Sequence, residues 1–352
     1  MNRKILFVVR SKLGDTLINY SLIRKYVDLN PSHDVYFLLR KDYASIIKNE
    51  VGLKIIPFSN KGMMYLKLLL LRLTKPKFDI LAILFGSGIP NRYIGLITNA
   101  KRKIIWDKKD APHIFEQGIN LHIENHTSPG ISVINKFDEK YRPPHILRIP
   151  SLINVRKLSK HFAIGIVPLS LELRRNMDVS SLRMLINFLK QKYPKKIIRV
   201  YINPKNQGAR AMIENNFINE IELIKIKKLE DIVSSYSELI AWFGVDTGLY
   251  HLAVSFGIPS TIFFGPTQPR SVVMSKQANV SAFRLKGLKN LHCDEKSCRK
   301  PTCLNHNISL FSTTKKLKIN FNELPEACLL RRIPKKNINL IKNFHRIKAK
   351  ES

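Results

Sequence analysis

The chain has 352 residues, of which 60 are lysine or arginine and 26 are aspartate or glutamate, so its formal net charge is +34. Its hydrophobic fraction of 44% is ordinary for a globular protein, which excludes a disordered chain, a collagen and a small disulfide-stapled scaffold. The positive excess predicts an anionic partner, either nucleic acid or a membrane surface, and the four cysteines fit a reducing compartment.

The first half of the sequence alternates apolar runs with helical patterns. Between the first two runs, apolar residues recur at helical spacing from Thr16 to Val27, and Asn30-Pro31 ends this predicted helix. A shift to proline and arginine at 141–150 predicts a linker. The apolar runs themselves predict buried strands at 4–10, 34–40, 78–86 and 101–107.

The second half repeats this organisation, and the length of the chain fits two domains. Strand followed by helix and strand is the βαβ unit of a parallel sheet, so we expect an α/β fold. No run approaches the roughly 18 apolar residues of a membrane span, and the N-terminus lacks the pattern of a secretory signal. Strands are predicted at 161–170, 197–203, 238–244 and 259–265.

Two segments do not fit this alternation. Residues 63–77 are apolar nearly all round, which is typical either of a buried helix or of a helix that lies at a membrane interface. Residues 335–352 hold six basic residues and one acid, with apolar residues three positions apart. This spacing predicts an amphipathic last helix with a basic face.

The first candidate site follows the first strand, in Ser11-Lys12-Leu13-Gly14-Asp15-Thr16. Gly14 allows the backbone to approach a ligand closely, and Asp15 would lie at the carboxyl end of the strands, where open α/β sheets bind ligands. The alternative is that Asp15 only caps the following helix. Neither a dinucleotide fingerprint nor a P-loop pattern occurs in this segment.

The second candidate site is Gly244-Val245-Asp246-Thr247-Gly248-Leu249-Tyr250-His251. Asp246 or Thr247 is expected to cap a helix, whose free N–H groups suit a phosphate. Thr247 and His251 are four residues apart and therefore share one face of that helix. A lone histidine in a helix is usually structural, but one turn from a glycine-flanked cap we favour a ligand role.

Two further clusters are less specific. Arg174 and Arg175 follow the strand at 161–169 and are suited to a diphosphate, unless they lie in a solvated loop. His292, Cys293, Cys298, Cys303 and His306 could hold zinc, but their spacing matches no standard zinc site. We favour an unliganded surface stretch there and expect no metal.

Taken together, the motifs resemble glycosyltransferase family 9, the bacterial heptosyltransferases of lipopolysaccharide core assembly. The matching segments are KILFVVRSKLGDTL, FDILAILFGSG and FGVDTGLYHLAVSFGIPSTIFFGPTQP, in the family's order over nearly the whole chain. The last, with its D-T-G-x-x-H-L-A helix start, is the most specific. The resemblance implies the GT-B fold, in which two Rossmann-like domains with parallel sheets face each other across a cleft.

The same resemblance implies that the chain is divided into three parts. Residues 1–155 would form a Rossmann-like domain that binds the acceptor, and residues 156–328 one that binds the nucleotide sugar. Residues 329–352 would form a basic C-terminal helix that crosses back and packs on the first domain.

Carried over residue by residue, the family pattern makes Asp15 the catalytic base. Arg175 would replace the lysine of the family's K-x-W-P pattern, whose tryptophan and proline are absent here. Residues 202–208 lack the acid with which the family contacts the ribose, and Gln207 is the nearest substitute. The expected donor-binding residues are Gly14, Thr16, Ser170, Arg175, Gln207, Asp246, Thr247, Gly248 and His251.

The implied reaction is an inverting transfer of heptose from ADP-heptose to the lipid A/Kdo inner core, without metal or cofactor. The implied place is the cytoplasmic side of the inner membrane, with the protein peripheral on that anionic surface. Part of the charge would then serve membrane contact through 63–77 and the last helix, and part would reflect compositional bias. Because the ribose acid is missing, a family 9 enzyme with another nucleotide sugar is the first alternative.

Two readings from other classes stay open. Charge alone suggests a nucleic-acid-binding protein, but no known nucleic-acid-binding signature occurs and the basic residues are scattered, so no nucleic acid is expected. An inactive scaffold is the second reading. The presence of Asp15 and of the D-T-G-x-x-H motif argues against it.

Overall fold

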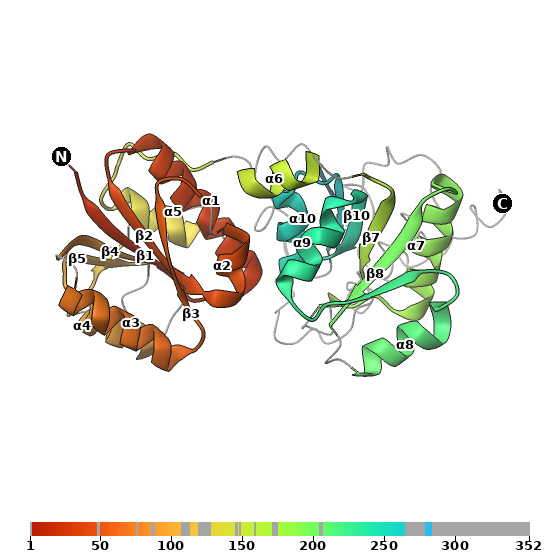
Figure 1. The fold of residues 1–352 in the computed structure, drawn as a ribbon, viewed down its shortest axis with the longest axis horizontal. Helices are drawn as coiled ribbons and strands as arrows, with labels where there is room; N and C mark the ends of the chain where they lie inside the picture. Colours follow the sequence, from red (N-terminus) through yellow and green to blue (C-terminus); the bar gives the residue numbers. More distant parts are fainter. Residues whose placement is uncertain are drawn as a thin grey trace, which may run out of the picture.

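The computed structural model describes residues 2–47, 50–74, 77–85, 89–106, 113–118, 128–144, 147, 149–157, 160–170, 175–203, 207–264 and 279–283. Within these residues the chain forms two parallel six-stranded sheets flanked by helices, one sheet in each half of the sequence (Figure 1). The expected α/β fold with two Rossmann-like halves is therefore confirmed. The predicted C-terminal helix at 329–352 lies outside the described residues.

The first sheet has the strand order β3-β2-β1-β4-β5-β6, and every neighbouring pair is parallel. Its strands are β1 (Lys4–Val9), β2 (Asp34–Arg40), β3 (Leu53–Phe58), β4 (Phe78–Phe85), β5 (Ala100–Ile105) and β6 (Glu116–Gln117). The helices of this half are α1 (Leu13–Leu29), α2 (Lys41–Ile47), α3 (Lys61–Thr74), α4 (Ile89–Ile97) and α5 (Ser128–Asn135).

The second sheet repeats this connection pattern in the order β9-β8-β7-β10-β11-β12, again all parallel. Its strands are β7 (Ala163–Val167), β8 (Ile197–Ile202), β9 (Glu222–Lys225), β10 (Leu239–Val245), β11 (Ser260–Phe263) and β12 (Val280–Phe283). The helices of this half are α6 (Pro150–Lys157), α7 (Val179–Lys192), α8 (Gln207–Phe217), α9 (Leu229–Ser237) and α10 (Gly248–Ser255).

The strand order places a topological switch point in each sheet. In the first sheet the chain reverses direction across the sheet between β1 and β4, and in the second between β7 and β10. Ligands of open α/β sheets bind outside the carboxyl ends of the strands at such points. The segments that follow β1, β7 and β10 are the ones that the sequence singled out, so the topology directs all three candidate clusters to ligand-binding edges.

Successive residues of a strand point to opposite faces of the sheet, so they belong to two different core layers. In β1, Ile5 and Phe7 belong to the core beneath α1, whereas Leu6 and Val8 belong to the core beneath α3 and α4. Both sets are fully buried, as expected for a central parallel strand. The core beneath α1 continues into the second half through α10, and Figure 1 shows α1 and α2 on the side of the first sheet that faces α9 and α10.

The helix within 63–77 is not a buried one. Only Met64 and Leu68 of α3 are buried, so that alternative from the sequence is wrong. Figure 1 places α3 and α4 on the face of the first sheet away from the second half. Among the described residues, none of the helices combines the length and the hydropathy of a membrane-spanning segment.

Candidate functional site

Asp15 lies in the first turn of α1, directly beyond the carboxyl end of β1. The residue in the cap position is Lys12, whose side chain makes no capping hydrogen bond, so the interpretation of Asp15 as the helix cap is wrong. Ser11 donates a hydrogen bond from its Oγ to Oδ2 of Asp15. Asp15 is thus held at the mouth of the sheet and remains partly exposed.

A tyrosine of α2, Tyr43, lies within electrostatic reach of this carboxylate. Burial raises the pKa of Tyr43 above its ordinary value; Arg40 opposes the shift, and the charges of Asp42 and Asp15 add to it. Sequence reasoning missed both Ser11 and Tyr43 as neighbours of Asp15. Ser11 stands four residues before Asp15, but Tyr43 comes from another element and carries no local signal.

Gly14 is the point at which the two halves meet. A Cβ on Gly14 would stand 2.7 Å from Cδ2 of His251 and 3.5 Å from Cα of Gly248, closer than a real side chain tolerates in the first case. A Cβ on Gly248 would in turn stand 3.0 Å from Cβ of Leu13. The N-terminal turns of α1 and α10 are therefore in direct contact, which brings the first and second candidate sites together.

Thr247 caps α10, as one of the two alternatives predicted. Its Oγ1 accepts a hydrogen bond of 3.1 Å from the N–H of Leu249. His251 follows one turn later and is buried, and its ring centroid lies 4.8 Å from that of Tyr250. Burial raises the pKa of Tyr250 above its ordinary value, with the charge of Asp246 as the second cause.

Asp246 and Arg175 form an ion pair of 2.9 Å between Oδ2 and Nη1. Their side chains are only 7% and 18% exposed, so little water screens the pair. Arg175 follows β7 and Asp246 follows β10, the two strands of the switch point. The solvated-loop interpretation of Arg175 is wrong, because the guanidinium is turned toward the edge of the sheet.

The loop that carries Arg175 is closed by two hydrogen bonds between its two ends. Asn176 accepts a 2.7 Å hydrogen bond at Oδ1 from the N–H of Ser170, and the N–H of Met177 donates 2.9 Å to the carbonyl of Pro168. This holds the arginine near Ser170 at the carboxyl end of β7. Residues 171–174 lie outside the described residues, Arg174 among them.

The remaining predicted residues are not seen in side-chain contact with Asp15 or with the pair of Arg175 and Asp246 in the described part of the chain. Thr16 is buried and its Oγ1 bonds the carbonyl of Lys12 at 3.0 Å, so it serves its own helix. Gln207 is the first residue of α8, and its side chain lies outside the described part. The cysteine-containing stretch 292–306 is outside it as well, and the described residues hold no group of three potential metal ligands.

A second polar cluster occupies the switch point of the first sheet. Arg10, the residue after β1, donates from Nε and Nη2 to Oδ1 of Asn91 at 3.1 and 2.8 Å. Burial is the main cause that lowers the pKa of Arg10, and Tyr65 opposes the shift. Sequence reasoning missed this pair, although Asn91 lies just beyond the carboxyl end of β4 where a ligand contact is expected.

The chain matches no protein-family model, and no curated protein matches its sequence. Its fold is similar to that of solved glycosyltransferases. The E. coli heptosyltransferase WaaC with ADP aligns with a TM-score of 0.66 at 14% identity, over 88% of this chain and 98% of that one. A glycosyl transferase family 9 structure from Veillonella parvula gives 0.66 at 12% identity, over 80% and 85% of the two chains.

A third similar structure, the E. coli ADP-heptose lps heptosyltransferase II, has a TM-score of 0.64 at 14% identity and covers 88% of this chain and 98% of its own. All three alignments span both sheets of the present chain. The fold is therefore the GT-B fold of these family 9 structures, as the motifs predicted.

Proposed function

We propose that this chain is a family 9 glycosyltransferase in which Asp15 is the general base and the second half binds the nucleotide sugar. The observation that supports this most directly is the contact of α1 with α10. It joins a partly exposed carboxylate to a helix N-terminus and a largely buried ion pair, each at the switch point of its own sheet. The domain boundaries at 155 and 328 belong to the same proposal.

The donor diphosphate would bind at the start of α10. The free N–H groups of Thr247 and Gly248 offer hydrogen bonds and a partial positive charge, and Arg175 offers a fixed guanidinium nearby. As the sugar leaves, negative charge grows on the diphosphate, and donors already held in place stabilise it without reorganisation. The other residues of the predicted binding set are Gly14, Thr16, Ser170, Asp246 and His251, and Gln207 is the candidate for the ribose.

The transfer itself would be a single displacement. The acceptor hydroxyl oxygen attacks the anomeric carbon while the bond from that carbon to the donor phosphate breaks, and the hydroxyl proton passes to Asp15. Attack opposite the leaving group inverts the anomeric configuration. The hydrogen bond from Ser11 holds the carboxylate in one orientation before the substrate arrives.

The finer assignment is heptose transfer from ADP-heptose to the lipid A/Kdo inner core, at the cytoplasmic face of the inner membrane. It is supported by the motifs and by the fold shared with heptosyltransferases whose structures hold ADP or an ADP-heptose analogue. The missing ribose acid keeps a different nucleotide sugar as the alternative within the family.

Calorimetric titration with ADP, GDP and UDP tests the proposal. We expect ADP to bind selectively and Arg175→Gln to abolish that binding. The matched control is Arg183→Gln, because Arg183 is also ion-paired, 3.0 Å from Glu220, but lies on the outer helix α7. Selective binding of GDP or UDP would keep the site and overturn heptose as the donor. Binding of none of the three would contradict the proposed donor site and favour a scaffold.

A further inference from the structure

Helix α3 carries a second apolar stripe that is largely exposed in the described fold. Met64 and Leu68 face the sheet, whereas Leu66, Leu69, Leu70 and Leu73 are between 45% and 73% exposed. The exposed four are spaced i, i+3, i+4 and i+7, so they share one face of the helix. A surface helix normally carries charged residues on that face.

Helix α4 extends this stripe. Ile89, Tyr93 and Leu96 are spaced at i, i+4 and i+7 and are each at least half exposed. The two helices touch, with the ring of Tyr93 5.9 Å from that of Tyr65. We call this face the α3–α4 surface; its members are Met63, Leu66, Leu69, Leu70, Leu73, Ile89, Tyr93 and Leu96.

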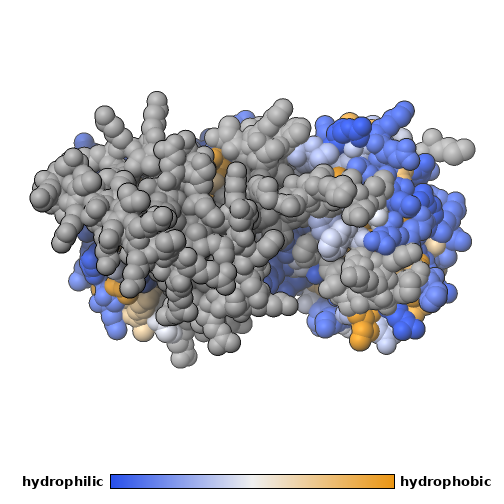
Figure 2. Space-filling model, turned by 180° about the vertical axis from the view of Figure 1, so that it is seen from behind, coloured by the Kyte–Doolittle hydropathy of each residue, from blue (hydrophilic) through white to orange (hydrophobic). Residues whose placement is uncertain are grey.

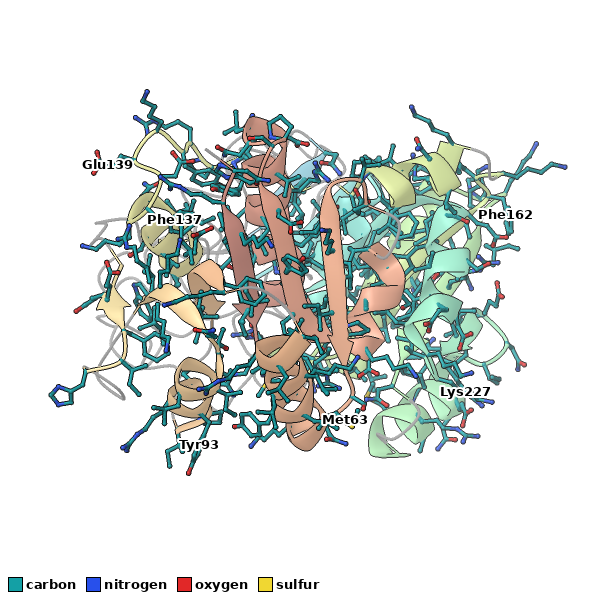
Figure 3. All side chains as sticks on the ribbon, turned by 60° about the vertical axis from the view of Figure 1, so that its left-hand side comes forward. Met63, Tyr93, Phe137, Glu139, Phe162 and Lys227 are labelled. Atoms are coloured by element: carbon teal, nitrogen blue, oxygen red, sulfur yellow. The ribbon has the colours of Figure 1, made fainter. Side chains whose placement is uncertain are left out.

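The figures show where this surface lies. Figure 3 places Met63 and Tyr93 together at the lower edge of the first half, below its sheet. Figure 2 shows hydrophobic atoms at the lower edge of that half among hydrophilic ones. Exposed apolar residues gathered on two adjacent helices mark an interaction site more often than singly scattered ones do.

The charges around the surface are almost all positive. From Asn60 to Trp106 the sequence has nine basic residues and one acid, Asp79. Asp79 is already paired with Lys101 at 2.6 Å. Burial lowers the pKa of Lys103, and the neighbouring charges of Arg72 and Lys77 lower it further. Arg72, Lys77 and Lys103 are therefore within electrostatic reach of one another, and Arg72 also donates to the carbonyl oxygen of Leu96 at 3.5 Å. Within the described residues none of these three cations is in an ion pair with an acid.

An open groove of about 520 Å³ adjoins the same surface. It runs from Leu96 on α4 along β5, past Lys101, Arg102 and Lys103, to His113 and Phe115. The charged side chains of its lining are basic apart from that of Glu116, which pairs with Arg102 at 2.7 Å. Of the lysines and the arginine in this lining, Lys103 is the one without an acidic partner among the described residues. Lys103 therefore links the groove to Arg72 and Lys77.

We propose that the α3–α4 surface docks the protein on an anionic phospholipid bilayer. The leucines would enter the interfacial layer, while Arg72, Lys77 and Lys103 would meet lipid phosphates at the rim and in the groove. A second copy of this chain is a poorer occupant, because it would bring two sets of unpaired cations together. The inference deepens the membrane contact expected for residues 63–77; it rests on that part of the proposed function and not on the transfer reaction.

Vesicle co-sedimentation of the full chain tests this. We expect binding to vesicles that contain phosphatidylglycerol, weak binding to phosphatidylcholine vesicles, and loss of binding at high salt. Leu70→Asp with Leu73→Asp should weaken binding to the anionic vesicles about tenfold or more. Arg72→Glu with Lys77→Glu and Lys103→Glu should do the same, since each cation adds attraction at the lipid surface.

Matched controls lie on the second half. Ile218→Asp removes an exposed isoleucine there, and the triple change of Lys157, Lys195 and Lys227 to glutamate removes the same charge from exposed positions. Both should bind vesicles as the unchanged chain does. Equal binding of test and control variants, or equal binding to both kinds of vesicle, would overturn the proposal.

Three further measurements keep the outcomes separate. A loss of self-association in the leucine variant, without a change in vesicle binding, would assign the surface to a second copy and overturn the lipid proposal. Circular dichroism checks that each variant is folded. ADP titration of the same variants should be unchanged, so a failure of the proposed donor site and a failure of membrane docking are told apart.

Discussion

The imidazole of His251 fills the space that a side chain on Gly14 would need. A Cβ there would lie 2.7 Å from Cδ2 and 3.3 Å from Nε2 of the ring, and both residues are buried. Since Gly14 opens α1 and His251 lies in α10, this contact fixes how close the two halves approach. The glycine is required by packing between the halves and not by its own backbone conformation, because its φ is not positive.

Gly14→Ala should therefore be destabilising. The methyl group would force the buried His251 ring to move, and such overpacking costs about 1–3 kcal/mol. Urea unfolding measures the difference. Gly208→Ala is the control, because a Cβ on Gly208 in helix α8 meets nothing within 4 Å and should stabilise by up to about 1 kcal/mol. Equal effects of the two substitutions would contradict the contact.

Asp15→Asn tests the proposed base. The amide is nearly isosteric and keeps a polar group beside Ser11, so we expect unchanged donor affinity, whereas turnover should fall by about 10² or more because no group accepts the proton. Asp28→Asn is the control: Asp28 is on the same helix, in a surface pair with Arg24 at 2.6 Å. Normal turnover of the Asp15 variant would remove this residue from the mechanism.

The sequence predicted the central strands and the three ligand-binding segments because these carry continuous apolar runs and glycine-flanked turns. Four strands were missed, and all four are edge strands that are short or of mixed burial: Leu53–Phe58, Glu116–Gln117, Glu222–Lys225 and Val280–Phe283. The start of α1 was placed three residues late, at Thr16 instead of Leu13. Neither Lys12 nor Leu13 resembles a helix start, because no side chain caps this helix.

The candidate site was predicted residue by residue but not as an assembly. Asp246 and Arg175 were expected to bind a donor, yet nothing in the sequence says that they pair at 2.9 Å, since 70 residues of chain separate them. The contact of Gly14 with His251 is likewise a product of how two sheets pack. Pairings between distant segments follow from the tertiary fold, and local periodicity carries no information about them.

The edge of the first sheet gives a prediction for acid stability. A hydrogen bond from Lys101, and then one from the N–H of Lys4 at 2.9 Å, lower the pKa of Asp79. A carboxyl with a lowered folded pKa adds stability above its unfolded pKa of about 3.9, and this is lost as the pH falls through the folded value.

Asp79→Asn should accordingly reduce stability at neutral pH by about 1 kcal/mol or less, since the pair is largely solvated. As the pH falls below about 4, the free energy of unfolding of this variant should also decrease less than that of the unchanged chain. Urea unfolding at a series of pH values measures both effects. Glu139→Gln, in an exposed turn, serves as the control and should leave the acid dependence as it is.

The pair of Arg175 and Asp246 should behave as one unit. Asp246→Ala leaves a guanidinium that is only 18% exposed without its carboxylate, and breaking a buried pair in this way costs about 3–5 kcal/mol. Arg175→Met with Asp246→Leu removes both charges at similar volume, so this double variant should be more stable than Asp246→Ala alone.

A double-mutant cycle separates the two contributions of this pair. Because the residues touch, the cycle of single and double variants in urea unfolding should give a coupling of about 1–3 kcal/mol, and additive effects would contradict the ion pair. The double variant should regain stability yet bind no ADP, since the diphosphate loses its cation in every variant that lacks Arg175. ADP binding by the stable double variant would instead mean that the N–H groups of α10 hold the diphosphate without Arg175.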